Sequence, residues 1–286
     1  MEQLASRRVP TFVIAPARGG LSIRLKELWE YRELLYFLIW RDVKVRYKQT
    51  VLGALWALFQ PLFSMVIFTL FFDRLAKIGS DGLPYPLFSL AALVPWTFFS
   101  TGLTQSTNSL VGSANLIKKV YFPRGIIPAA AVLAGLVDLA LALCMFFGAL
   151  ACYGWWPGAT VFLLPVAVIW ICAVAFATGL WLSALNVDYR DVKFVAPFLV
   201  QIWMFVSPVI YPASRVTAAL SKRGLPEWLY GLNPMAGVVE AFRYALLGTT
   251  ACPVSFFVAG AVVTALLLLS GVAYFKRMER TFADVV

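Results

Sequence analysis

The amino-acid sequence predicts an all-α integral membrane protein with six transmembrane helices. Hydrophobic residues make up 61% of its 286 residues, charged residues only 13%, and the mean hydropathy is +0.81. A soluble domain usually carries about 25% charged residues. The apolar residues form runs long enough to cross a hydrocarbon core of about 30 Å, and Lys and Arg are concentrated in alternate connections between these runs.

The first crossing begins with a sharp change from charged to apolar residues. A basic collar, made of Arg41, Lys44, Arg46 and Lys48, precedes an uncharged run from Val51 to Phe72. Pro61 removes a backbone hydrogen bond inside this run, so it is a candidate hinge. We predict a transmembrane domain over 51–275, with crossings at 51–72, 87–111, 126–153, 161–185, 194–211 and 254–275. The fifth is short and contains Pro197 and Pro208.

Residues 1–50 are predicted to form a cytoplasmic tail followed by an amphipathic helix. From Leu21 onward, leucines recur at helical spacing, and the pattern continues into an apolar stretch, 34–40, that is too short to span. Since Arg32 and Arg41 flank this stretch, we expect a helix that lies in the membrane interface. A helix that docks on a partner protein from the soluble side is the alternative.

The distribution of basic residues predicts that both termini are cytoplasmic, with 276–286 as the C-terminal tail. Segments assigned to the inside hold 18 Lys and Arg residues, and those assigned to the outside hold six. No signal peptide is visible, so we expect the first crossing to be retained. In a soluble protein, the net charge of +10 would suggest nucleic acid; here we assign it to loops that face anionic lipid, and expect no nucleic-acid partner.

The sequence offers no residue set for catalysis, metal binding or cofactor binding. It has no His, its four Cys lack metal-ligand spacing, and it contains no phosphate-binding P-loop. Asp188 and Asp191 flank Arg190, a pattern more typical of a salt-bridged loop than of a metal site. We therefore expect no cofactor in this chain.

Polar residues inside the crossings are candidates for function. Asp138, near the middle of the third crossing, costs roughly 2.5–3.5 kcal/mol to insert, so it should face the bundle interior and have a partner. Gln60 and Gln201 are the candidate partners, and we favour a structural role over proton coupling. In the second crossing, hydroxyl and amide groups can either join helices or line a hydrated path. They are Thr101, Thr104, Gln105, Ser106, Thr107, Asn108 and Ser109.

Aromatic residues gather in three groups. Aromatic faces can pack against the C–H faces of sugars. Interfacial belts and core packing are the commoner reasons for such groups, and from the residues alone we favour them. The groups are Trp56, Phe59 and Phe63; Trp96, Phe98 and Phe99; and Trp203 with Phe205.

The segment 212–250, before the last crossing, is predicted to re-enter the outer leaflet as short helices. It is too apolar for a plain loop, and its apolar runs are too short for two crossings. Irregular backbone at membrane depth is tolerated only against protein or a water-filled cavity. We therefore expect this segment to help form the outer mouth of a cavity.

Several stretches carry a family resemblance, in order, from about residue 30 to the C-terminus. They are RYKQTVLGALWALFQPL (46–62), NLIKKVYFPR (115–124), LNVDYRDV (185–192) with Pro197-Phe198, and SPVIYP (207–212) with NPMAG (233–237) and EAFR (240–243). Together they resemble the permeases of polysaccharide and polyol-phosphate exporters, the membrane subunits of ABC transporters for O-antigen, capsule and wall teichoic acid. Asp188 departs from the pattern, because a basic residue is expected there.

The resemblance implies the ABC-2 permease fold (type II exporter, type V), with six helices, an N-terminal interface helix and re-entrant outer-gate helices. It implies a homodimer in the bacterial inner membrane, with two ATPase subunits that bind ATP and Mg. The loop 113–125 would couple to the ATPase through Lys118, Tyr121, Phe122 and Arg124, together with Arg46. Implied channel-lining residues are Trp56, Phe59, Gln60, Phe63, Trp96, Phe99, Thr104 and Asn108; implied outer-gate residues are Tyr211, Pro212, Asn233, Glu240 and Arg243.

The expected function is therefore that of the channel-forming subunit of an ATP-driven exporter for a lipid-linked polysaccharide. An ABC-2 permease for a drug or lipid cargo is the alternative. A stand-alone membrane enzyme or secondary transporter is a third hypothesis, and the lack of His and of paired intramembrane acids weighs against it.

Overall fold

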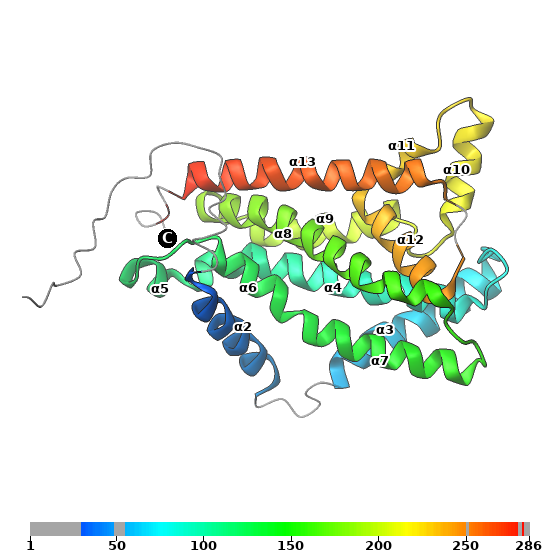
Figure 1. Cartoon of the computed structure of the whole chain (residues 1–286), viewed down its shortest axis with the longest axis horizontal. Helices are drawn as coiled ribbons and strands as arrows, with labels where there is room; N and C mark the ends of the chain where they lie inside the picture. Colours follow the sequence, from blue (N-terminus) through cyan, green and yellow to red (C-terminus); the bar gives the residue numbers. More distant parts are fainter. Residues whose placement is uncertain (1–29, 49–54, 250–251, 280–281, 283–286) are drawn as a thin grey trace, which may run out of the picture.

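The computed structural model describes residues 30–48, 55–249, 252–279 and 282, and this part of the chain is all-helical (Figure 1). The predicted tail 1–20, the start of the N-terminal helical pattern, the start of the first crossing and most of the C-terminal tail lie outside the described residues. The helices are α2 (Arg32–Tyr47), α3 (Leu55–Phe68), the π-helix η1 (Thr69–Leu75), α4 (Tyr85–Gly112), α5 (Ala114–Lys119), α6 (Ile126–Ala134), α7 (Leu136–Cys152), the 3₁₀ helix η2 (Ala159–Leu163), α8 (Leu164–Asp188), α9 (Val192–Val206), α10 (Ala213–Lys222), α11 (Trp228–Gly231), α12 (Pro234–Leu247) and α13 (Val254–Met278).

Five helical segments in the described part are long and apolar enough to cross a membrane. They are Leu55–Leu75, Tyr85–Gly112, Ile126–Cys152, Ala159–Asp188 and Val254–Met278. The crossing predicted over 194–211 is instead the 15-residue helix α9. At about 1.5 Å per residue, α9 covers about 22 Å, which is less than the hydrocarbon core of about 30 Å. Pro208 follows its end, in keeping with a residue that cannot continue a helix.

The long helices run side by side, and the connections gather at two ends (Figure 1). The turn that carries α5 and the C-terminal end of α13 lie at one end, and α10 and α11 lie at the other. The predicted cytoplasmic loop and the predicted outer segment are thus at opposite ends of the bundle.

Helix α2 extends beyond the apolar stretch from which the interface helix was predicted. It does not stop near Trp40 but continues to Tyr47, so that Arg41, Lys44 and Arg46 of the basic collar are helical. It runs obliquely to the long helices (Figure 1). Leu38 is buried against the bundle, whereas Tyr36, Phe37 and Trp40 are exposed.

The third long segment is interrupted near its middle. Helix α6 ends at Ala134 and α7 begins at Leu136, with Gly135 between them. The Gly135 amide donates to the Val132 carbonyl at 3.0 Å, a bond over three residues in place of the usual four. A Cβ at Gly135 would lie 3.2 Å from the ring of Phe98 on α4. Only glycine lets α4 approach the joint this closely.

Helix α4 is the centre of the bundle. It packs against α3, α6, α7, α8, α9 and α12, and it forms most of the main hydrophobic core with buried residues from α7, α8 and α12. A second cluster, around Leu110, Phe122 and Phe275, joins the C-terminal end of α4 to α2, α6, α8 and α13. The elements at the predicted cytoplasmic end thus share a core of their own.

We predict that Gly179→Ala destabilises the protein, because α4 and α8 meet most tightly there. A Cβ at this position would lie 2.9 Å from the Cβ of Ser106, a clash that no side-chain rotation relieves. Overpacking of this kind typically costs about 1–3 kcal/mol. Thermal unfolding of the detergent-purified protein should show a lowered midpoint.

Two further variants test the cause. Gly148→Ala in α7 meets nothing within 4 Å and should not lower the midpoint, because alanine favours a helix interior more than glycine does. Adding Ser106→Gly to Gly179→Ala removes the clashing atoms and should raise the midpoint again. A midpoint that stays low in the double variant would contradict the packing explanation.

Candidate functional site

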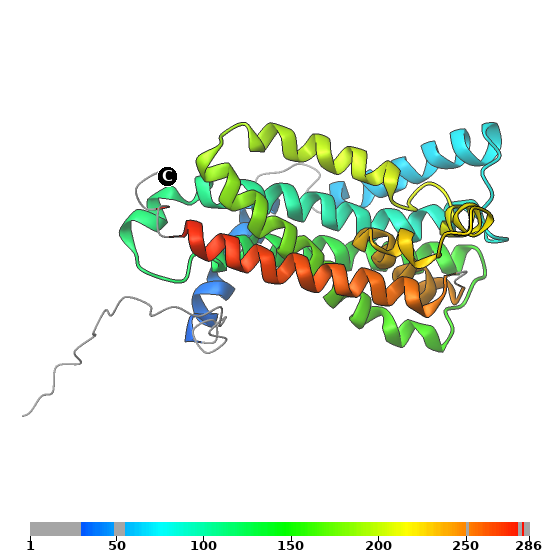
Figure 2. The ribbon, with the colours of Figure 1, turned by 90° about the horizontal axis from the view of Figure 1, so that it is seen from above.

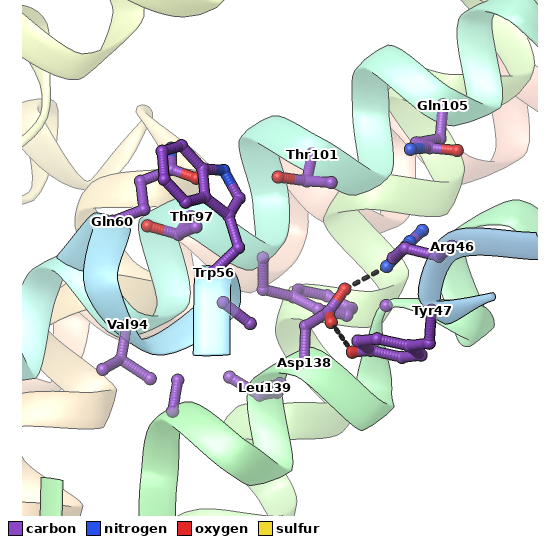
Figure 3. A pocket seen from close by; sticks show the side chains of 14 residues that line it. Arg46, Tyr47, Trp56, Gln60, Val94, Thr97, Thr101, Gln105, Asp138 and Leu139 are labelled. Carbon is purple, nitrogen blue, oxygen red and sulfur yellow. Dashed lines mark hydrogen bonds and ion pairs between the residues drawn. The ribbon is translucent and has the colours of Figure 1, made fainter. Parts of the chain in front are cut away.

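A cavity of about 520 Å³ lies between α3, α4, α7 and the end of α2 (Figure 3). Helix α3 contributes Trp56 and Gln60, and α4 contributes Thr97, Thr101 and Gln105. The walls combine an aromatic ring with amide and hydroxyl groups on a largely apolar surface. Such a surface can contact both the C–H and the polar parts of a ligand.

Asp138 lies in the wall of this cavity and is paired with α2. Its carboxylate accepts from the Arg46 guanidinium and from the Tyr47 hydroxyl (Figure 3). The prediction of Gln60 or Gln201 as partner is therefore wrong, although Gln60 lines the same cavity. The prediction failed because we assigned the basic collar to topology alone, whereas α2 carries its last turn up to the α6–α7 joint.

Asp138 lies in the first turn of α7, where Arg46 and Tyr47 at the end of α2 reach its carboxylate. Burial, and then the hydrogen bond to Asp138, raise the pKa of Tyr47 above its ordinary value, so Tyr47 remains a protonated donor. The three side chains together form one charge-assisted contact between α2 and α7.

A second cavity, of about 480 Å³, adjoins the first and shares Arg46 and Gln105 with it. Its remaining polar lining comes from Arg41 and Asp42 of α2, which form a salt bridge at 2.8 Å, and from Thr104, Asn108, Ser109 and Ser113. The two cavities follow one face of α4 from its middle toward its end near α5.

The polar residues of the second crossing divide between two roles. Thr101, Thr104, Gln105 and Asn108 recur at helical spacing and line the cavities. Ser106 and Thr107 are fully buried, and Asn186 of α8 donates to the Thr107 carbonyl at 3.0 Å. One face of α4 therefore lines the cavities and another packs against α8, while the hydroxyls of Thr104, Thr107 and Ser109 donate to carbonyls of α4 itself. A hydrated path along the cavity-lining face stays a prediction.

The predicted channel-lining residues separate in the structure. Trp56, Phe59, Gln60 and Phe63 are exposed on α3, while Thr104 and Asn108 line the second cavity. Trp96 and Phe99 are buried instead: Phe99 is fully covered and meets the Trp203 ring edge-on, with centroids 5.1 Å apart. In this structure they pack the core of α4 and belong to neither cavity.

The predicted coupling loop presents some of its residues and buries others. Lys118 is exposed, and Tyr121 is 81% exposed. Phe122 is only 3% exposed and packs in the second hydrophobic cluster, so it presents no surface to a partner. Arg124 is bound to the C-terminal end of α13: its backbone N–H donates to Glu279 Oε1 at 2.9 Å, and its guanidinium donates to the Glu279 carbonyl.

The predicted outer-gate residues meet around the turn between α9 and α10. Buried Arg243 forms a salt bridge with Glu240 at 2.6 Å and donates to the Val209 carbonyl at 3.2 Å. Its guanidinium lies 3.6 Å from the centroid of the Phe88 ring on α4. The α12 helix therefore holds the turn against α4.

Asn233, Tyr211 and Pro212 complete this cluster. Asn233 caps the start of α12, because its Oδ1 accepts from the Met235 N–H in the first turn. The same oxygen accepts from Trp203 Nε1 of α9 at 2.8 Å. The hydroxyls of Tyr211 and Tyr230 lie 3.1 Å apart, and Pro212 is buried before α10. The segment 212–250 is thus fastened to α9 at several points.

We predict opposite outcomes for two neighbouring residues of the 113–125 loop. Phe122→Ala should lower the free energy of unfolding of the purified chain by about 3–5 kcal/mol, the usual cost of deleting a buried aromatic ring, and so lower the unfolding midpoint. Tyr121→Ala removes an exposed ring and should leave the unfolding midpoint unchanged. Equal effects of the two substitutions would contradict the burial difference.

We further predict that Arg243→Ala destabilises the outer segment by about 3–5 kcal/mol, because it leaves Glu240 buried without its charged partner. Arg243→Met with Glu240→Gln removes both charges and should recover part of that loss. Limited proteolysis between α9 and α12 would detect the change. The expectation fails if Arg243→Ala is as resistant to protease as the unmodified protein.

Comparison with known proteins shows what the chain is similar to. Residues 33–247 match the family model for the ABC-2 type transporter. Over 265 residues the chain is 30% identical to the O-antigen export system permease protein RfbA of Myxococcus xanthus, covering 92% of this chain and 100% of that protein.

Two further relatives extend this similarity. The RfbA protein of Klebsiella pneumoniae is 25% identical over 272 residues, covering 93% of this chain and 100% of the relative. The polysialic acid transport protein KpsM of Escherichia coli is 23% identical over 215 residues, covering 72% of this chain and 78% of the relative.

Proposed function

Because the chain belongs to the ABC-2 type transporter family, we propose that it is the channel-forming subunit of an ATP-driven exporter for a lipid-linked polysaccharide. The observation that carries the proposal is the full-length similarity to permeases named for O-antigen export, together with a similarity to a permease named for polysialic acid transport.

The cavity chemistry supports a glycan cargo. Trp56 offers an aromatic face, while Gln60, Gln105 and Thr101 offer hydrogen-bonding groups in the same space. A sugar chain presents both C–H faces and hydroxyls, so it can use both kinds of wall. Export of a drug or lipid, the alternative from the sequence, finds no support in the names of these relatives.

The proposal assigns ATP hydrolysis to a separate ATPase chain that binds ATP and Mg, with no cofactor in this chain. The sequence lacks a P-loop, in agreement with that division of labour. Lys118, Val120 and Tyr121 are exposed at the end of the bundle that also holds the end of α13 (Figure 1). They form the surface that we assign to the ATPase, since an exposed aromatic beside a cation is a common interface anchor.

Two apolar helices support a homodimer. Figure 2 shows α9 and α3 along one edge of the bundle, and most of their large side chains are exposed, among them Phe63 and Phe198. Gln60 and Gln201 are exposed on the same helices. Because Gln201 lines neither cavity and an amide facing only lipid is unfavourable, these faces suit a second copy of the chain with a polar path between the protomers.

The proposed location is the bacterial inner membrane, with both termini in the cytoplasm. The excess of Lys and Arg in the N-terminal region, the 113–125 loop and the C-terminal tail supports this orientation. The polymer would then pass from the α5 end of the bundle toward α10 and α11.

We predict that Trp56→Ala lowers glycan export roughly two- to twelvefold, the range expected when about 0.5–1.5 kcal/mol of aromatic contact is lost. The variant should be co-expressed with its neighbouring ATPase in cells that lack the chromosomal copy. Glycan at the cell surface and lipid-linked glycan left on the cytoplasmic face of the membrane should then both be quantified.

Trp156→Ala is the matched control, because Trp156 is 83% exposed in the connection between α7 and η2, away from both cavities. It should export as the unmodified protein does. If deletion of the gene leaves surface glycan unchanged, or if no complex with the ATPase can be isolated, the proposed function is wrong.

A further inference from the structure

Helix α2 contacts both sides of the joint between α6 and α7. Near its middle, Leu38 is 2% exposed and packs in one cluster with Ile127 and Ala130 of α6. At its end, Arg46 and Tyr47 bond to Asp138 of α7. One short helix therefore bridges the joint, by apolar contacts on one side and by charge on the other.

The joint is a point where the third segment can bend. The Gly135 amide bonds to Val132 rather than to a residue four positions back, and no Cβ stiffens the backbone there. Asp138 lies one turn beyond Gly135, on the α7 side. A force applied at Asp138 therefore acts on the angle of α7 relative to α6.

That angle sets the shape of the larger cavity. Asp138, Leu139 and Ala142 form the α7 wall, opposite Trp56 and Gln60 of α3 (Figure 3). A rotation of α7 about the joint moves this wall toward or away from α3. The width of the cavity is thus mechanically connected to the position of α2.

The contact at Asp138 has few competitors. A carboxylate in an apolar helix has few alternative partners, and the other side chains that line this cavity carry no charge. The side chains of Arg46 and Asp138 are only 20% and 22% exposed, so water competes weakly for the pair.

We propose that Asp138 is a positioning residue for transport: it fixes the end of α2 to α7, so that movement of α2 bends the α6–α7 joint and changes the cavity. The proposal rests on the proposed function, in which the ATPase would supply the movement from the α5 end of the bundle, where α2 begins (Figure 1). The contact stays formed throughout; it is a link between helices and not a latch that opens.

Charge exchange tests the link. With the partner ATPase co-expressed, Asp138→Asn and Arg46→Gln should each lower export by about tenfold, the scale of coupling between contacting side chains. The exchange variant Arg46→Asp with Asp138→Arg should recover about half of the export or more. Asp188→Asn, which alters an exposed acid at the end of α8, should export normally. Normal export by Asp138→Asn, or no recovery in the exchange variant, would overturn the proposal.

A covalent link separates positioning from mere stability. In a protein whose four cysteines are replaced by Ser, the pair Arg46→Cys and Asp138→Cys should export poorly until a short bis-methanethiosulfonate reagent joins the two thiols. Reduction should abolish export again. Complex yield and unfolding midpoint should be measured in both states.

The outcomes distinguish this inference from the proposed function. A cross-linked protein that remains inactive, or export that follows the unfolding midpoint alone, would overturn the link while leaving the exporter assignment intact. Absence of glycan export by the unmodified complex would instead refute the exporter assignment on which the link depends.

Discussion

The structure depends on one constraint: polar groups within an apolar bundle must find their partners inside the protein. Asp138 and Arg243 find partners on other elements, and Glu240 pairs with Arg243 one turn along the same helix. Asp138 joins α7 to α2, and Arg243 joins α12 to the α9–α10 turn. The same constraint explains why the turn after α9 can leave helical geometry, since Tyr85 and Arg243 donate to the Ile210 and Val209 carbonyls.

Around these fixed contacts, packing on α4 determines where the space lies. One face of α4 meets α8 so closely that Gly179 sits directly on Ser106. Another face carries Thr101, Thr104, Gln105 and Asn108 along two adjoining cavities. A tightly packed side and a loosely packed side on a single helix concentrate the empty volume next to α2 and α3. The candidate site is therefore a consequence of unequal packing as much as of its lining residues.

Much of the fold was predictable because helices that face lipid must be built from long runs of apolar residues. Uninterrupted apolar runs located the long helices, and the family model and relatives confirm the ABC-2 resemblance. Contacts across long sequence separations were not predictable: Arg46 and Asp138 are 92 positions apart, and only the direction of α2 brings them together. Nor could the sequence distinguish Tyr121 from Phe122, or exposed Trp56 from buried Trp96, because aromatic rings suit a core and a cavity wall alike. The break at Gly135 had a signal, a glycine just before an intramembrane acid, that we did not use.

The contact between Arg124 and Glu279 fastens the loop assigned to the ATPase to the C-terminal end of α13. Both the backbone and the side chain of Arg124 rely on Glu279, and Phe282 is fully buried against Phe275, with ring centroids 5.3 Å apart. A change at Glu279 therefore acts on the loop, although Arg124 and Glu279 lie 155 positions apart in the sequence. Shortening the chain to Met278 removes the anchor of the loop without altering any of its own residues. Glu279 and Phe282 thus support the loop from outside its own sequence.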